Sequence, residues 1–234
     1  MADSRREELE AGLLRVRERV AAACERADRS PDELTLVVIT KFFPASDVRL
    51  LAGLGVTEVG ENRHQEAVEK AAECADLGLA WHFVGGLQSN KAAAVASYAD
   101  VVESVDRAKL LRPLASGAEA RSREVDVLLQ VSLDPPGRDG RSGAEPDALA
   151  DLAAAVEATA MLRLRGLMAV APLGEEPRPA FDRLASIHRE LLVEHPGATW
   201  LSAGMSGDLE QAVHAGATHV RVGSAVLGSR PQFK

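Results

Sequence analysis

Short apolar runs alternate along the chain with longer segments in which apolar residues recur every three or four positions. Runs that are apolar on both faces are typical of parallel strands buried between a core and covering helices. Segments with one apolar stripe are typical of the helices that cover such a sheet. We expect strands at residues 34–40, 57–60, 81–84, 101–105, 125–131, 164–170, 200–203 and 219–222. We expect helices at residues 45–54, 65–75, 107–121, 147–159, 178–194 and 208–215, and one that begins at Asn90 after a capping Ser89.

Eight such strand-helix units predict an α/β fold, a (β/α)8 or TIM barrel, which typically takes roughly 250 residues. The chain has 234 residues and suits one domain over residues 1–234, with the barrel at about 34–230. A further amphipathic helix at about 4–27 precedes the first strand. We expect that extra helix to pack across the outside or the bottom of the barrel.

Turns that contain glycine and serine follow the last two predicted strands. Gly204-Met205-Ser206-Gly207 follows strand 200–203, and Gly223-Ser224 follows strand 219–222. The loops after strands seven and eight of a (β/α)8 barrel are a common phosphate site, because free backbone N–H groups at helix starts favour anions. A single glycine is explained as well by the demands of a tight turn. The pair of turns, each with a serine, indicates a phosphate site.

Lys41 directly follows the strand at 34–40, on the same side as Val37 and Ile39. At the carboxyl mouth of a barrel this position is partly desolvated, which disfavours the ammonium form and frees the amine to attack a carbonyl. A lysine that extends into water is an equally good interpretation. We expect the remaining lysines to be solvated: Lys70, Lys91, Lys109 and Lys234.

Arg221 stands between Val220 and Val222 in the last strand and therefore faces the barrel interior. It either pairs with a strand-borne carboxylate, such as Glu58 or Glu103, or meets a ligand near the phosphate loops. Because strands one and eight adjoin in a closed barrel, Lys41, Arg221 and both turns converge on one mouth. Pyridoxal 5'-phosphate needs such a set, since its aldehyde forms a Schiff base with lysine and its phosphate is anchored separately.

Six motifs identify a family more specifically than this geometry does. They are TKFFP (40–44), GEN (60–62), WHFVGGLQSNK (81–91), RGLMAV (165–170), LSAGMSGDLEQAV (201–213) and RVGSAVLG (221–228). With these motifs the chain resembles the YggS/PROSC family of pyridoxal-phosphate-binding proteins over almost its whole length. The resemblance implies the fold-type III barrel of the alanine racemase N-terminal domain.

The resemblance also implies the roles of individual residues. Lys41 is the lysine that forms the aldimine, Arg221 lies near the pyridine ring, and the phosphate contacts come from Ser206, Gly223 and Ser224. Asn62 and Met205 are further pocket residues. The implied function is the intracellular homeostasis of vitamin B6, with no established enzymatic turnover.

Three functions follow from these observations. The first is a monomeric carrier or reservoir that hands pyridoxal phosphate to apo-enzymes. The second is a weak racemase-like enzyme, which needs an acid or base on each face of the substrate carbon. Lys41 serves one face, but related racemases take the other from a tyrosine of a second domain, and the single tyrosine here, Tyr98, is expected beside the helix after the third strand. The third is a barrel that binds another phosphorylated metabolite without a covalent bond.

Composition argues against several other classes of function and location. A net charge of -8 and a pI of about 5.3 argue against an extended surface for nucleic acid or anionic membranes. Cys24 and Cys74 are too few for a disulfide framework, the six histidines show no ligand-like spacing for a metal, and the charged N-terminus is unlike a signal peptide. We therefore expect a cytoplasmic protein. The segment 134–146, rich in Pro, Gly and charge, is either a lid or a tolerated insertion.

Overall fold

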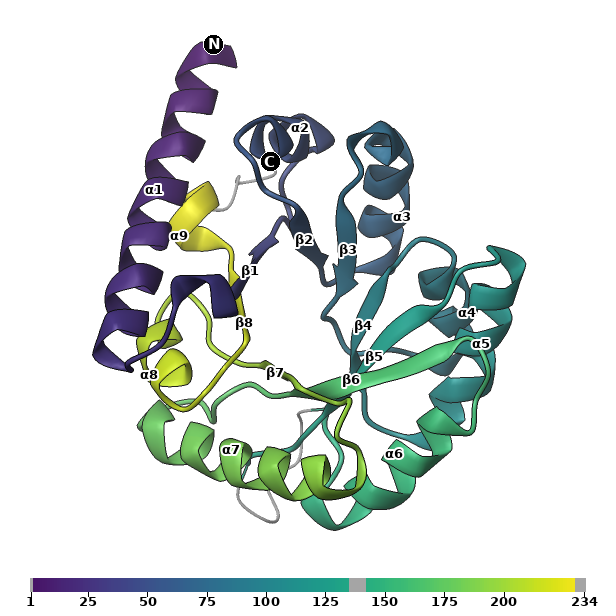
Figure 1. The fold of residues 1–234 in the computed structure, drawn as a ribbon. Helices are drawn as coiled ribbons and strands as arrows, with labels where there is room; N and C mark the ends of the chain where they lie inside the picture. Colours follow the sequence, from purple (N-terminus) through teal and green to yellow (C-terminus); the bar gives the residue numbers. More distant parts are fainter. Residues whose placement is uncertain (1, 135–141, 230–234) are drawn as a thin grey trace.

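Parallel strands close into a barrel in chain order in the computed structural model of the protein, which describes residues 2–134 and 142–229 (Figure 1). The strands are β1 (Thr35–Ile39), β2 (Glu58–Glu61), β3 (Ala80–Phe83), β4 (Val101–Val105), β5 (Val125–Gln130), β6 (Leu162–Met168), β7 (Trp200–Ser202) and β8 (His219–Val222). Helices between the strands form the outer layer (Figure 1). The predicted (β/α)8 barrel is therefore confirmed.

The helices agree with the predicted segments to within a few residues at most ends. They are α1 (Ala2–Arg26), α2 (Ala45–Gly53), α3 (His64–Glu73), α4 (Ala92–Ala96), α5 (Leu111–Ala120), α6 (Leu149–Glu157), α7 (Pro177–Glu194), α8 (Leu209–His214) and α9 (Ser224–Leu227). Short 3-10 turns precede three of them, at Ser89–Lys91, Ala108–Leu110 and Pro146–Ala148. Such tighter turns are frequent at the ends of α-helices.

The predicted capping role of Ser89 is wrong. Ser89 is the first residue of a 3-10 turn whose N-cap position is Gln88, and no side chain caps that turn. The α-helix begins only at Ala92, after Lys91 at its N-cap. The chain enters α4 through the tighter turn, so the serine lies inside the turn and not before it.

The barrel closes between its first and last strands. The two strands run parallel, with Val37 opposite Arg221 and Val38 opposite Val222. Lys41 lies two residues after the end of β1, and Gly223 follows the last residue of β8. The register therefore brings the end of β1 and the turn after β8 to the same carboxyl mouth.

The first helix packs on the outside of the barrel, one of the two places expected for it, beside α8 and α9 (Figure 1). Leu9, Leu13 and Val16 form its buried stripe. Gly12 lies against α9 so closely that a Cβ at this position would be 2.3 Å from the carbonyl oxygen of Val226. A glycine is therefore needed for the observed packing of α1 on α9.

Apolar side chains fill the layer between strands and helices, but several polar side chains occupy part of the barrel interior. Buried hydrophobic residues form one large cluster around β4 to β7 and a second one that joins α1 to β1, β2 and β8. Glu103, Ser202 and Arg221 are buried among the strands. The barrel interior is therefore partly polar.

Several other expectations concern features outside the barrel core. Cys24 and Cys74 are both buried free thiols. Within the described ranges no cluster of side chains has the make-up of a metal site, and no helix there has the length and apolar character to cross a membrane. The predicted lid or insertion at 134–146 falls largely on residues 135–141, which lie outside the described residues, as does Lys234.

Candidate functional site

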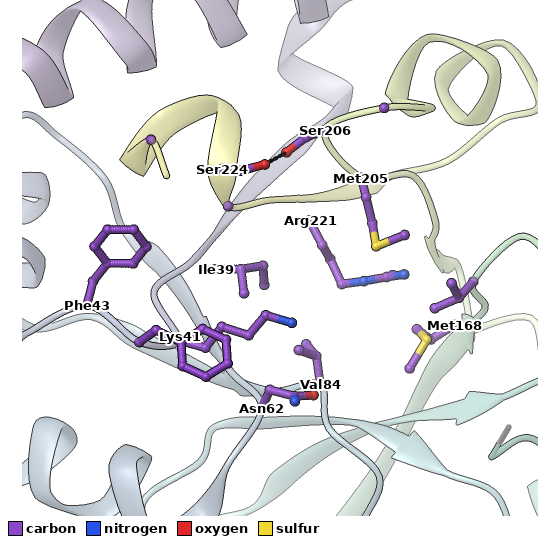
Figure 2. Close-up of a pocket in the computed structure, with 15 residues that line it drawn as sticks. Ile39, Lys41, Phe43, Asn62, Val84, Met168, Met205, Ser206, Arg221 and Ser224 are labelled. Carbon is purple, nitrogen blue, oxygen red and sulfur yellow. Dashed lines mark hydrogen bonds between the residues drawn. The ribbon is translucent and has the colours of Figure 1, made fainter. Parts of the chain in front are cut away.

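A pocket of about 340 Å³ opens at the carboxyl mouth of the barrel (Figure 2). Its lining comes from the ends of β1, β2, β3 and β6 and from the turns after β7 and β8. All the site residues predicted from the sequence line this one pocket: Lys41, Asn62, Met205, Ser206, Arg221, Gly223 and Ser224. The structure therefore brings the predicted set together, whatever the role of each member.

The turn after β1 directs Lys41 into the pocket. Its side chain extends into the space that Asn62 and Arg221 also border (Figure 2). On its C-terminal side, Phe42 has a φ of 71°, in the left-handed region that bulky residues rarely adopt. Lys41 is thus presented from a tight, strained turn at the end of a buried strand.

The turns after β7 and β8 meet at a pair of hydroxyl groups. The Ser224 hydroxyl donates to Oγ of Ser206 at 3.3 Å (Figure 2). The backbone N–H of Ala225 donates to the same oxygen at 3.4 Å. The first turn is held by Asp208, whose carboxylate accepts from the N–H of Met205 at 2.6 Å. Two turns from different strands therefore present hydroxyl and N–H groups at one place.

Gly204 makes the first of these turns possible. Its φ is 89°, and a Cβ there would lie 2.6 Å from the Cβ of Ala212 in α8. A side chain would meet both a strained backbone and a clash. The glycine therefore fixes how closely the Ser206 turn lies against its helix.

Arg221 is 4% exposed and has protein partners as well as a place on the pocket wall. Its guanidinium donates to Oγ of Ser202 at 2.6 Å and to the carbonyl oxygen of Ala169 at 2.8 Å, and lies 3.6 Å from the carboxylate of Glu103. Burial lowers the pKa of Arg221, while the charge of Glu103 opposes the shift. The predicted ion pair with Glu103 is confirmed, and it leaves the arginine bordering the pocket.

Behind Arg221, Glu103 continues a chain of buried polar groups. It accepts from the Ser202 hydroxyl at 2.6 Å and contacts Nδ1 of His82 at 2.7 Å, while Nε2 of His82 contacts Glu58 at 2.8 Å. Glu58, the alternative partner proposed for Arg221, is therefore engaged by the histidine. The arrangement therefore places one carboxylate, that of Glu103, next to the arginine.

Among these buried groups, each charge favours the charged form of its neighbour. Burial alone would lower the pKa of His82, but the hydrogen bonds to Glu103 and Glu58 outweigh it and raise the pKa to about 9. Burial alone would raise the pKa of Glu103, but the hydrogen bond and charge of His82, with the charge of Arg221, lower the pKa to about 2. At neutral pH His82 is thus a cation that donates to both carboxylates.

Sequence reasoning was wrong about Lys70 and missed part of the pocket wall. Lys70 is 4% exposed, because it is ion-paired with buried Glu61 at 2.6 Å and with Glu66 at 2.9 Å. Its position four residues after Glu66 on a helix was the available signal for this ion pair.

The pocket-lining residues that the sequence analysis did not identify were Ile39, Phe42, Phe43, Val84, Met168, Val170, Gly207 and Gly228, most of which lie in the quoted motifs.

Tyr98 does not line the pocket. Its ring stacks on that of His64, with 5.9 Å between the ring centres, and burial raises its pKa. Among the described residues of the pocket wall, Lys41 and Arg221 are the ionisable ones. The described wall therefore offers an amine and a guanidinium, without a tyrosine, histidine or carboxylate.

Comparison with known proteins gives concordant matches. The family model described as alanine racemase, N-terminal domain, matches residues 45–231. The pyridoxal phosphate homeostasis protein of Mycobacterium tuberculosis is 44% identical over 97% of this chain and 94% of its own length. The structure of PipY from Synechococcus elongatus with pyridoxal phosphate bound has a TM-score of 0.81 at 34% identity, covering 94% of this chain and 100% of that chain.

A more distant match concerns the fold alone. An alanine racemase from Clostridium difficile 630 superposes with a TM-score of 0.71 at 12% identity, covering 97% of this chain and 58% of that chain. The barrel is therefore of the fold-type III kind expected from the motifs. Lys41 lies just before the residues that the family model matches, so its place in the pocket comes from the structure itself.

Proposed function

The chain belongs to the alanine racemase N-terminal domain family, and from that premise we propose that it is a pyridoxal 5'-phosphate-binding protein. In this proposal it holds the cofactor covalently through Lys41 and acts in intracellular vitamin B6 homeostasis as a carrier or reservoir. The names of its relatives support the same role, since several are called pyridoxal phosphate homeostasis protein.

One observation carries the proposal: an amine, a guanidinium and two hydroxyl-bearing turns line a single pocket. A volume of about 340 Å³ lies in the range of small-molecule sites, roughly 300–1,000 Å³. The described wall has cationic and hydroxyl groups without a carboxylate, as an anionic phosphate ester with an aldehyde requires. The residues present therefore fit this cofactor.

Each polar residue then has a task. Lys41 would hold the cofactor covalently, because an amine condenses with an aldehyde and releases water. Ser206, Gly223 and Ser224 would hold the phosphate, while Asn62 and Met205 would contact the ring from the pocket wall that they line. Arg221 would present its fixed positive charge to the ring, which would disfavour protonation of the ring nitrogen. The cofactor is then a poorer electron sink, which favours storage over chemistry on amino acids.

A weak racemase-like activity is the second candidate, because the fold is shared with alanine racemase. Racemisation needs a proton-transferring group on each face of the substrate carbon. In the described pocket wall Lys41 can supply one face, whereas the guanidinium of Arg221 stays protonated and Tyr98 lies elsewhere. The geometry thus favours the carrier.

The proposal also covers the oligomeric state, the cellular compartment and the partners. As a carrier the protein would act as a single-domain monomer in the cytoplasm and pass the cofactor to apo-enzymes that depend on it. Two buried free thiols suit a reducing compartment. Light scattering during size exclusion tests the monomer directly.

Reductive trapping tests the proposal. The purified protein is mixed with pyridoxal phosphate and borohydride, and the modified lysine is located by mass spectrometry. Label on Lys41, with visible absorbance that is lost in Lys41→Ala and kept in Lys109→Ala, supports the assignment; Lys109 is an exposed control. Label spread over surface lysines without preference for Lys41 would overturn it and favour non-covalent binding of another phosphorylated metabolite.

Two further measurements separate carrier from enzyme. Loaded protein is mixed with an apo-enzyme, and recovered activity of that enzyme measures transfer; no transfer at physiological concentrations contradicts the carrier role. Optical rotation of pure L-amino acids is followed in parallel. A rotation that decays with the wild type and not with Lys41→Ala would favour the racemase.

A further inference from the structure

The turn that carries Lys41 is held from both sides by a buried ionic cluster, which consists of Glu61 from β2 and Glu66 and Lys70 from α3. Glu61 and Lys70 are almost fully buried, and Glu66 is partly buried. This cluster does not line the pocket. Its contacts with the turn nevertheless fall on the two residues that flank Lys41.

Before the lysine, every polar group of Thr40 is engaged. Its N–H donates to the carbonyl oxygen of Gly60 at 2.9 Å, and its hydroxyl donates to Glu61 at 2.6 Å. Its carbonyl oxygen accepts from Nζ of Lys70 at 2.9 Å and from the N–H of Phe43 at 3.1 Å. Thr40 is fully buried, so its orientation is set by these contacts.

After the lysine, the backbone N–H of Phe42 donates to Oε1 of Glu66 at 2.5 Å. Phe42 has a left-handed φ of 71°, which a bulky side chain adopts only with strain. Such a conformation persists where the surroundings determine it, and the charged acceptor on α3 does so here. The guanidinium of Arg63, 5.0 Å from the centre of the Phe42 ring, holds the side chain as well.

Lys70 joins the contacts on the two sides of Lys41, so that the ionic cluster forms a clamp around the turn 40–42. An ammonium group has three donors, and Lys70 directs them to Thr40 O at 2.9 Å, Glu61 at 2.6 Å and Glu66 at 2.9 Å. The same Glu66 oxygen accepts from Phe42, so one bridge runs from the residue before Lys41 to the residue after it.

Buried ion pairs contribute little net stability, because desolvation offsets their attraction. Burial in fact raises the pKa of Glu61, although Lys70 and Thr40 oppose the shift. The cluster is therefore better explained by the backbone shape that it imposes than by stabilisation of the fold.

We propose that Lys70 and Glu66 are positioning residues that hold the turn 40–42 in the conformation from which Lys41 reaches an aldehyde in the pocket. The inference rests on the proposed function and adds to it how the reactive amine is aimed. The clamp acts on covalent capture and not on the hold of the phosphate, because the turns of Ser206 and Ser224 come from other strands.

Two ligands separate these effects. Pyridoxal phosphate measures covalent capture through its visible absorbance and through borohydride trapping at Lys41. Pyridoxine 5'-phosphate has no aldehyde and measures non-covalent binding alone. We expect Glu66→Ala to slow capture by roughly 10- to 100-fold, as a misplacement of about 1 Å does for a reacting group, with the affinity for pyridoxine 5'-phosphate within about twofold of wild type.

The amide in Glu66→Gln keeps an oxygen that can accept from Phe42 and should restore most of the capture rate. Glu69→Ala removes an exposed carboxylate from the same helix and should leave both ligands unaffected. Lys70→Met should slow capture like Glu66→Ala; if it does not fold, the two Glu66 variants still decide, since Glu66 is partly exposed.

The outcomes are distinct. Capture at the wild-type rate in Glu66→Ala overturns the clamp, and so does an equal loss of both ligands, which would mean a merely structural role. Absence of capture by the wild-type protein overturns the proposed function, and the clamp with it. Slow capture with intact pyridoxine 5'-phosphate binding, and rescue by glutamine, supports the inference.

Discussion

Ser224 Oγ lies 3.3 Å from Ser206 Oγ, although the residues are 18 positions apart and follow different strands. The contact exists because β7 and β8 are neighbours and each ends in a turn that faces the mouth. A hydroxyl group can donate one hydrogen bond, so a phosphate placed between these groups can accept from both. In the proposed function this pair would hold the phosphate independently of the attachment at Lys41.

The first prediction concerns that separation. Hydrogen bonds to a charged group contribute about 1.5–3 kcal/mol each, so the loss of two in Ser206→Ala with Ser224→Ala should weaken pyridoxal phosphate binding by roughly 100-fold or more. Pyridoxal, which has no phosphate, should bind the double variant and the wild type equally. Titration of visible absorbance with both ligands checks this. An equal loss for pyridoxal would show that the substitutions distort the pocket instead.

The second prediction concerns Glu103, the shared partner of His82 and Arg221. Glu103→Gln keeps the side-chain shape but leaves two buried cations without their common anion. Breaking a buried pair in this way costs about 3–5 kcal/mol. Urea unfolding of Glu103→Gln measures the loss, with exposed Glu119→Gln as the matched control. A loss no greater than that of the control would mean that Glu103 is not the counter-charge of this group.

A third prediction follows from the raised pKa of His82. The ordinary pKa of about 6.5 becomes about 9 in the folded protein, so the folded state binds this proton more tightly than the unfolded state. The resulting stabilisation is complete below pH 6.5 and is lost as the pH rises through about 9. Its size is at most about 3 kcal/mol for a shift of this order.

The variant His82→Gln tests this dependence. The wild type should lose stability between pH 6.5 and 9 more steeply than the variant, in urea unfolding measured at matched ionic strength. Other groups that contribute to the pH dependence of stability are present in both proteins and cancel in the difference. Parallel curves for the two proteins would contradict the prediction.

The barrel was predictable because its evidence is local. Each strand is a short apolar run and each helix has its own stripe, so chain order alone gives β1 next to β8 and Lys41 near Arg221. The convergence of the serine turns followed from the same topology. The roles of the pocket residues stay predictions until a ligand is bound.

Pairing among charged side chains was the part that the sequence did not determine. Lys70 has the composition of a solvated helix residue, and its burial depends on where α3 lies over the end of β1. Arg221 had two possible partners, and its guanidinium lies 3.6 Å from Glu103, while Glu58 contacts His82. Such choices depend on distances across several strands, which a linear pattern does not contain.

The last prediction links helix α1 to the Ser206 and Ser224 turns of the pocket. A Cβ at position 12 would lie 2.3 Å from the Val226 oxygen, so Gly12→Ala must push α9 away from α1. Overpacking of this kind costs about 1–3 kcal/mol. Because Ser224 is the first residue of α9, the displacement should also draw its hydroxyl from Ser206 and weaken binding of pyridoxal phosphate more than that of pyridoxal.

Gly53→Ala is the matched control for this prediction. Gly53 is also helical, but a Cβ there meets nothing nearer than a side-chain nitrogen of Arg6 at 3.9 Å. That variant should be as stable as the wild type or slightly more so, because alanine loses less backbone entropy than glycine on folding. Thermal unfolding and the two ligand titrations distinguish the variants. If Gly12→Ala keeps the wild-type preference for the phosphorylated ligand, α1 covers the barrel without setting the position of the Ser224 turn.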